Sequence, residues 1–322
     1  MTNEINFNQN KPTVGISGCL LGQKVRYDGG HKRSRFCTDA LSEVVEFHPL
    51  CPEMAIGLGA PRPTIRLEKG DNDSVIARCS DGRDLTAPLK EYGKTVSSQI
   101  SHLSGYIFCA NSPSCGMEKV KIYPAAKNIP GVKAGIGVFA REIMKANPLL
   151  PVEENGRLND PILRENFVNR VFAYQHWQRL TADGLTPKAL IAFHSQYKYL
   201  LLAHDRTGYQ ALGKLLANLK NNFEQICDDY IALFMETMTK RVNRRQHTNV
   251  MAHIQGHFKH QLDSKQRVEL ANTIDKYRIG RLPLLAPMTL LRHYLNEHPN
   301  DYIASQVYLQ PHPEVLELRC GL

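Results

Sequence analysis

Three short apolar runs, each followed by a cysteine in a turn, constrain the fold of this chain more than any other feature. The runs are residues 13–17, 44–48 and 105–110, and the thiols that follow them are Cys19, Cys51 and Cys115. Short apolar runs closed by glycine, proline or asparagine are typical of buried strands. If the three runs are neighbouring parallel strands of one sheet, the three thiols meet at its carboxyl edge, where α/β folds bind their ligands.

Length predicts two domains among the 322 residues. Strand-like runs and helical stretches alternate over residues 1–150, which predicts an α/β domain with a Rossmann-like, mainly parallel sheet. Residues 151–160, in a proline-rich run, predict a linker. Glycine is sparse in residues 161–322, and seven segments there have helical periodicity, which predicts an all-α domain.

Smaller elements of the first domain follow from the same patterns. Residues 65–67 and 75–77 predict a hairpin, and residues 120–123 predict another short strand or extended segment. The apolar spacing of residues 84–103 predicts a helix, and a second helix is expected over residues 135–145.

Composition places the chain in a compartment and suggests a partner. No run of about twenty apolar residues is present, and the polar start lacks the apolar core of a secretory signal, so we expect the cytoplasm and no membrane contact. Eight cysteines are too few for a disulfide scaffold in a chain of this length, and in a reducing compartment they are more often metal-binding or catalytic. The net charge of +9 favours an anionic partner such as nucleic acid.

Several kinds of chemistry could use the three thiols. Structural zinc is poorly supported, because the chain has no Cys-x-x-Cys or Cys-x-x-His spacing. A catalytic cysteine with a histidine partner would use one thiol, whereas an iron–sulfur cluster held on three corners would use all three and leave one iron without a protein ligand. Cysteines also pack as small hydrophobic residues, and we assign to that role Cys37, Cys79, Cys109, Cys227 and Cys320, of which Cys37 and Cys109 are the most open to revision.

Two polar segments near the thiols are candidates for binding and catalysis. Residues 24–33 are dense in Lys, Arg and Gly, a composition that lets a loop approach a phosphate or a base, although it also suits a solvated loop. Glu53 follows Cys51 by two residues, and it is a candidate general acid or base if it is buried. Otherwise it is an ordinary surface glutamate.

The second domain contains one dense group of cations. Four of them fall within six residues, interspersed with Asn and Val and followed by Gln and His: Lys240, Arg241, Arg244 and Arg245. This composition suits a phosphate backbone, and a solvated helix end is an equally good interpretation.

Four ordered motifs together resemble the TudS family of thiouracil desulfidases. They are Gly-Cys-Leu-Leu-Gly at 18–22, Arg-Tyr-Asp-Gly at 26–29, Cys-Pro-Glu at 51–53 and Ser-Pro-Ser-Cys-Gly at 112–116. The resemblance covers about the first 150 residues. The remainder, including residues 166–176 and 193–199, resembles the helical domain that is fused to TudS in the two-domain desulfidases called RudS.

The resemblance implies a cofactor and a reaction. It implies a 4Fe-4S cluster bound by Cys19, Cys51 and Cys115, with the fourth iron open for the substrate sulfur, and catalytic roles for Glu53 and Ser112. The reaction would be a hydrolysis of the carbon–sulfur bond that releases sulfide and needs no electron donor. From loop position and charge, our candidates for holding the substrate are Arg26, Tyr27, Asp28, Arg62 and Ser114.

The resemblance also suggests the substrate. RudS-type proteins are associated with 4-thiouridine in tRNA, which would become uridine, and clustered cations in a second domain fit an RNA partner. Free 2-thiouracil or thio-UMP is the alternative, and it would need only the first domain. A third interpretation is a non-enzymatic iron–sulfur protein that binds RNA or senses redox state.

Overall fold

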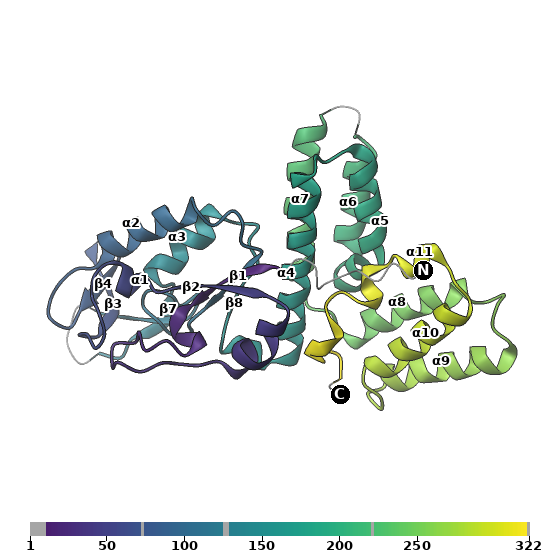
Figure 1. Cartoon of the computed structure of the whole chain (residues 1–322), viewed down its shortest axis with the longest axis horizontal. Helices are drawn as coiled ribbons and strands as arrows, with labels where there is room; N and C mark the ends of the chain where they lie inside the picture. The colour runs from purple at the N-terminus through teal and green to yellow at the C-terminus, as the bar shows by residue number, and fades with distance from the viewer. Residues whose placement is uncertain (1–10, 72–73, 125–128, 220–221, 321–322) are drawn as a thin grey trace. The chain divides into compact units, whose positions relative to one another are not determined.

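The chain folds into two compact units that meet in sequence between Asp160 and Pro161. This computed structural model describes residues 11–71, 74–124, 129–219 and 222–320. The first unit is α/β and the second is helical, so the predicted fold class is confirmed (Figure 1). The polar start of the chain up to residue 10 and the tip of the predicted hairpin, residues 72–73, lie outside the described residues.

A four-stranded parallel sheet with the order β2-β1-β5-β8 organises the first unit. Its strands are β1 (Thr13–Ser17), β2 (Glu46–Leu50), β5 (Gly105–Phe108) and β8 (Val152–Glu154). The three runs predicted as neighbouring parallel strands are therefore β2, β1 and β5, side by side as expected. The central strands β1 and β5 are almost wholly buried, which explains their continuous apolar sequence.

A second, mixed sheet has the order β4-β3-β6-β7. Its strands are β3 (Ile65–Lys69), β4 (Val75–Cys79), β6 (Val120–Tyr123) and β7 (Val132–Gly135). The predicted hairpin is the antiparallel pair β3 and β4. The predicted strand at 120–123 is β6, which pairs with β3 in parallel and with β7 in antiparallel orientation.

Two helices cover the inner face of the second sheet. They are α2 (Thr86–Ser97) and α3 (Val138–Ala146), which pack side by side (Figure 1). The apolar cluster beneath them joins side chains of the sheet and of the helices, including Leu67, Ala77, Leu89, Val120 and Val138. Both helices are shorter than predicted, because residues 98–103 form turns and Gly135 ends a strand.

The predicted linker, residues 151–160, is wrong. This segment forms β8 at the edge of the parallel sheet and a short 3-10 helix, Arg157–Asn159. The two consecutive glutamates of this segment are buried: the backbone N–H of Met117 donates to Oε1 of Glu154 (2.6 Å), and Nε of Arg157 donates to Oε1 of Glu153 (2.6 Å). Because both carboxylates are hydrogen-bonded, they can be buried beside the edge strand β8.

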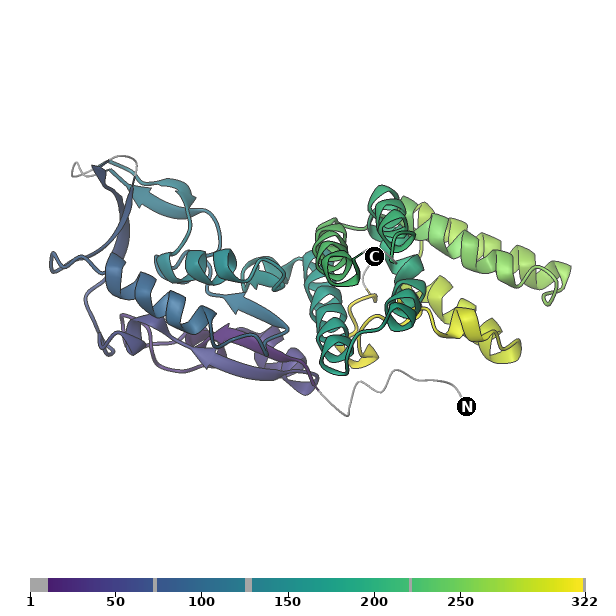
Figure 2. The same cartoon turned by 90° about the horizontal axis from the view of Figure 1, so that it is seen from above.

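The second unit contains all seven predicted helices, drawn in teal to yellow in Figure 2. They are α4 (Pro161–Ala182), α5 (Pro187–His204), α6 (Arg206–Leu216), α7 (Phe223–Thr239), α8 (Arg244–His257), α9 (Ser264–Arg278) and α10 (Leu285–Glu297), and the short α11 (Asp301–Ala304) follows. Side-chain caps such as Asp205, Asn243 and Asp263 begin three of these helices. Over the described residues, no helix is both long and apolar enough to span a bilayer.

Candidate functional site

A cavity of about 430 Å³ lies where the central strands of the parallel sheet end. Four thiols line it: Cys19, Cys51, Cys109 and Cys115. Cys19 lies in the turn after β1, Cys51 directly follows β2, and both Cys109 and Cys115 come from the loop after β5. The predicted meeting of Cys19, Cys51 and Cys115 at the carboxyl edge is therefore observed, in a cavity whose volume is typical of small-molecule sites.

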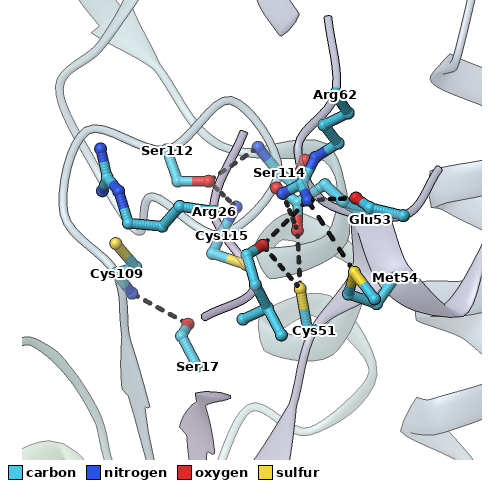
Figure 3. A network of polar contacts seen from close by, with 12 residues as sticks. Ser17, Arg26, Cys51, Glu53, Met54, Arg62, Cys109, Ser112, Ser114 and Cys115 are labelled. Atoms are coloured by element: carbon cyan, nitrogen blue, oxygen red, sulfur yellow. Dashed lines mark hydrogen bonds and ion pairs between the residues drawn. The ribbon is translucent and has the colours of Figure 1, made fainter. Parts of the chain in front are cut away.

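The short helix α1 (Pro52–Ala55) brings a carboxylate to the thiol of Cys51. Cys51 is the residue before the helix and Glu53 lies in its first turn, so the two side chains project together. Sγ of Cys51 donates to Oε2 of Glu53 over 3.4 Å (Figure 3), and Glu53 is only 8% exposed. Burial, reinforced by the charge of Glu53, raises the pKa of Cys51 to about 11.

Arg62 holds this carboxylate in place. Its Nη2 lies 3.8 Å from Oε2 of Glu53, and its Nη1 donates to the carbonyl oxygens of Val25 and Gly59, each over 2.8 Å. Its backbone N–H donates to the carbonyl of Tyr27. Arg62 lines the cavity as predicted, and its Nη1 and backbone N–H are engaged within the protein, so it positions Glu53 and two loops.

The turn that carries Cys115 closes on Ser112. Oγ of Ser112 accepts the backbone N–H groups of Cys115 (3.0 Å) and Ser114 (3.3 Å), and Ser112 is part of the cavity lining. Gly137, just before α3, packs against this turn: a Cβ there would lie 2.5 Å from the carbonyl of Ser114. Burial raises the pKa of Cys115, with the nearby charge of Glu53 as the next cause.

Cys109, which the sequence pattern assigned to packing, also lines the cavity. Its backbone N–H donates to Oγ of Ser17 (3.1 Å), and Lys32 lies close by, with Nζ donating to the carbonyl of Ala110 (3.1 Å). A hydrogen bond with the Cys19 thiol lowers the pKa of Cys109 to about 7, assisted by the charge of Lys32, while the same hydrogen bond raises the pKa of Cys19.

Cys109 and Ser17 line the cavity although the sequence pattern did not place them there, and Lys32, within the candidate binding segment 24–33, lines it too. One signal was available for Cys109: it directly follows the strand whose loop carries Cys115. Nothing in the sequence indicated a role for Ser17, because serine is common where a strand gives way to a turn.

The predicted substrate-binding residues divide into two groups. Arg26 and Tyr27 line the cavity, with the Arg26 guanidinium 5.5 Å from the Tyr27 ring centre. Asp28 and Ser114 do not line it. The carboxylate of Asp28 accepts the N–H of Gly30 (3.0 Å) and shapes its exposed loop, and Ser114 is buried within its turn. The Asp28 carboxylate lies 3.6 Å from Nε of Arg26, a cavity residue, so the predicted substrate contacts of Asp28 and Ser114 stay predictions.

The predicted RNA-binding cations lie at the junction of α7 and α8. Nζ of Lys240 forms an ion pair with Asp205, and Nη1 of Arg244 donates to the carbonyl of Tyr277 (3.2 Å), so both contribute to the fold. Arg241 and Arg245 are exposed. Within the described part of the chain, these two of the four present their charge to solvent without such structural contacts.

The donor set of the cavity fits a metal cluster. Over the described ranges, no three His, Cys, Asp or Glu side chains are grouped as a single metal ion requires. A single zinc ion binds all of its thiolates at a Zn–S distance of about 2.3 Å. In an iron–sulfur cluster each thiolate binds a different iron, so the cysteine sulfur atoms lie further from one another than they do around one zinc ion. Thiols from three strand ends around one cavity are a donor set that fits an iron–sulfur cluster.

The fold and the site define a two-domain protein with a thiol-lined cavity at the edge of a parallel sheet. Residues 14–155 match the family model described as 2-thiouracil desulfurase, and residues 198–313 match a model described as a protein of unknown function, DUF1722. A protein of Escherichia coli strain K12, uncharacterized protein YbgA, is 38% identical over 152 residues, which are 47% of this chain and 90% of that protein. The chain belongs to the family of YbgA and joins a 2-thiouracil desulfurase domain to a DUF1722 domain.

A solved structure is also similar to part of the chain. It is that of the 4Fe-4S-dependent thiouracil desulfidase TudS, which is 28% identical. The match covers 49% of this chain and 100% of the other, with a TM-score of 0.39.

Proposed function

We propose that this chain is an iron–sulfur-dependent desulfidase that removes sulfur from thiolated uracil, and that its substrate is 4-thiouridine in tRNA, which becomes uridine with release of sulfide. The observation that carries this proposal is the pairing of Glu53 with Cys51 inside a cavity that also contains Cys19 and Cys115. The match of residues 14–155 to the 2-thiouracil desulfurase model supports the same chemistry.

Cys19, Cys51 and Cys115 are the proposed ligands of a 4Fe-4S cluster. When bound, the cluster supplies an open iron, a soft Lewis acid suited to a thiocarbonyl sulfur. The three thiols are protonated in the free protein, since their pKa values are raised, Cys51 to about 11. Ligation therefore releases protons, and metal loading becomes more favourable as pH rises.

Glu53 is the proposed general base and acid. Its carboxylate accepts a hydrogen bond from the Cys51 thiol in the free protein, and deprotonation of that thiol frees Oε2 to hold a water. Glu53 would take a proton from this water as it attacks the thiocarbonyl carbon, and return it as the carbon–sulfur bond breaks. Arg62 keeps the carboxylate aimed at the cavity.

Ser112 is the proposed orienting residue. Its Oγ already accepts two backbone N–H groups, which leaves its own O–H to donate to the water or to the pyrimidine. Arg26 and Tyr27, also on the cavity wall, are suited to the phosphate and the base of a nucleotide.

A free thiolated base is the second candidate substrate. Every residue around the cavity belongs to the first unit, so free 2-thiouracil or thio-UMP could react without the helical domain. A base in folded RNA must first be turned out of its stack, which costs a few kcal/mol of free energy. Contacts of Arg241 and Arg245 with the RNA phosphates would offset this cost.

The test is turnover by anaerobically prepared protein. Loss of the near-ultraviolet thiocarbonyl absorbance of 4-thiouridine-containing tRNA, together with released sulfide, would support the proposal. A Glu53→Ala variant that keeps its iron and loses turnover would exclude a structural or redox-sensing cluster. If the loaded wild type leaves the thiolated tRNA, the free base and the nucleotide all unchanged, the proposed function is wrong.

A further inference from the structure

A hollow of about 440 Å³ lies on the second sheet and adjoins the catalytic cavity. Ile65, Asn111 and Pro113 line both spaces, so the two adjoin along this rim. Away from this shared rim, the hollow is lined by three cations, one aromatic ring and two apolar residues: Arg66, Lys121, Lys133, Tyr123, Leu67 and Val120. A molecule whose reacting end enters the cavity can therefore extend across this face.

The cations form a row across all four strands of the sheet. Arg66 on β3 is the register partner of Arg78 on β4, and Lys121 on β6 is the partner of Lys133 on β7. Since Leu67 pairs with Ile122 one position further along, Arg66 also neighbours Lys121. Like charges placed directly opposite one another destabilise a sheet, so this row costs stability unless an anion neutralises it.

The chain neutralises only one end of this row, as far as the described residues show. Glu68 accepts from both Arg66 (2.6 Å) and Arg78 (2.8 Å). Lys121 and Lys133 are exposed, and neither has an ion-pair partner within the described part of the chain. The opposite face of the sheet is occupied by the apolar cluster under α2 and α3, so all the cations face solvent.

An aromatic ring accompanies the two unpaired lysines. Tyr123 is half-buried on β6, two residues from Lys121 and therefore on the same face, and the Arg66 guanidinium lies 5.7 Å from its ring centre. From Arg66 to Lys133 the row crosses three strands, a span of about 10 Å. Lysines that bind phosphates beside a ring that stacks on a base are the elements of a single-stranded nucleic acid site.

We propose that the outer face of this sheet binds the phosphates and one base of nucleotides that flank the reacting nucleotide. The substrate is then a polynucleotide with an unpaired segment at the thiolated base, rather than a free base. The location of the thiolated base rests on the function proposed for the cavity, whereas the strand-binding face rests on the second sheet alone.

The experiment measures binding of a fluorescent single-stranded oligouridylate that contains no thiolated base, by anisotropy at several salt concentrations. The variant is Lys121→Glu/Lys133→Glu. The matched control is Lys90→Glu/Lys145→Glu, which makes the same charge change at exposed positions on α2 and α3. We expect the variant to bind the oligonucleotide at least about tenfold more weakly. The slope of the logarithm of the binding constant against the logarithm of the salt concentration should fall in magnitude by about 1.4, which corresponds to two lost phosphate contacts.

A second variant separates stacking from charge. Tyr123→Ala should weaken binding about tenfold with no change in the salt slope. Wild-type affinity in Lys121→Glu/Lys133→Glu, or an equal loss in the control, would overturn the inference.

Turnover distinguishes this inference from the proposed function. In protein that contains the cluster, Lys121→Glu/Lys133→Glu should slow the turnover of a thiolated oligonucleotide at least tenfold. The turnover rate of a free thiolated base should stay within about twofold of the wild-type rate. An equal loss on both substrates would count against a strand-binding face. If the wild type turns over neither substrate but oligouridylate binding still depends on the two lysines, the proposed function fails and this inference stands.

Discussion

Sγ of Cys51 lies 3.4 Å from Oε2 of Glu53, two residues further along the chain. The first turn of α1 enforces this proximity, because Pro52 begins the helix and directs both neighbouring side chains to the cavity. One turn thus supplies a thiol, a donor that soft metals prefer, and a carboxylate. A metal that takes the thiolate also frees the carboxylate from its hydrogen bond, which couples cofactor loading to the availability of a base.

Arg62 is expected to act by positioning Glu53. Arg62→Lys keeps the charge but cannot reach the carbonyls of Val25 and Gly59 and the carboxylate together. We predict that iron content stays near wild type while turnover falls about tenfold to a hundredfold. Arg35→Lys, at an exposed position outside the cavity lining, is the control and should match wild type. Unchanged turnover in Arg62→Lys would show that the guanidinium fork is not needed.

Gly137 is expected to be essential for the Cys115 turn. A Cβ at Gly137 would lie 2.5 Å from the carbonyl of Ser114 and 2.8 Å from the backbone nitrogen of Cys115, so Gly137→Ala must displace the turn. We predict that iron bound per chain falls by at least half. In Gly156→Ala the added Cβ meets only ordinary contact, with Ala110 at 3.6 Å, and iron should be unchanged. Full iron loading of Gly137→Ala would contradict the role assigned to this close packing.

Asn155 is expected to brace the loop after β5. Its Oδ1 accepts the backbone N–H of Ala110 (2.9 Å), so Asn155→Ala leaves a partly buried donor unpaired, at a cost of about 1–3 kcal/mol. We predict faster hydrogen exchange in residues 109–118, measured by mass spectrometry on the full chain. The exposed Asn159 provides the control, and Asn159→Ala should leave exchange there unchanged. Equal exchange in both variants would mean that β8 alone holds the loop.

Three buried histidines are expected to make the stability of the helical unit depend on pH. Burial lowers the pKa of His204 and His312 to about 4 and that of His247 to about 3, from an ordinary 6.5. The unfolded chain therefore binds more protons than the folded chain between about pH 6.5 and 4. The stabilisation is fully present above pH 6.5 and is lost as pH falls, by up to about 1.4 kcal/mol per pH unit for each histidine.

Fluorescence of Trp177 measures this effect, because it is the chain's one tryptophan and is buried in α4. The urea midpoint of its transition should fall between pH 7 and pH 5. His247→Gln should flatten that dependence, while His253→Gln, at an exposed position, should not. A midpoint that stays constant over this range would contradict the burial of these side chains in neutral form.

Sequence reasoning succeeded where periodicity and turn chemistry act locally. The apolar runs that end before Cys19, Cys51 and Cys115 predicted the parallel strands and the meeting of the thiols, because parallel strands share a carboxyl edge. The seven helices of residues 161–322 followed from the same reasoning.

Prediction failed where long-range pairing overrides composition. Glu153 and Glu154 look like linker residues until Arg157 and the N–H groups of the loop after β5 pair with them. Cys109 looked like a packing residue because nothing local shows that its thiol meets that of Cys19, 90 residues earlier. Ser114 and Asp28 lie within recognisable motifs but not in the cavity lining, and a motif alone does not show which of its residues line a cavity.

The most direct measurement is iron and sulfide content after anaerobic purification, for wild type and for four variants: Cys19→Ser, Cys51→Ser, Cys115→Ser and Cys109→Ser. We predict about four irons per wild-type chain, loss of the cluster in each of the first three variants, and retention in Cys109→Ser. A wild type without iron, or iron that survives removal of any of the three proposed ligands, would contradict the account. Loss in Cys109→Ser would make Cys109 a fourth ligand and leave no open iron for the substrate.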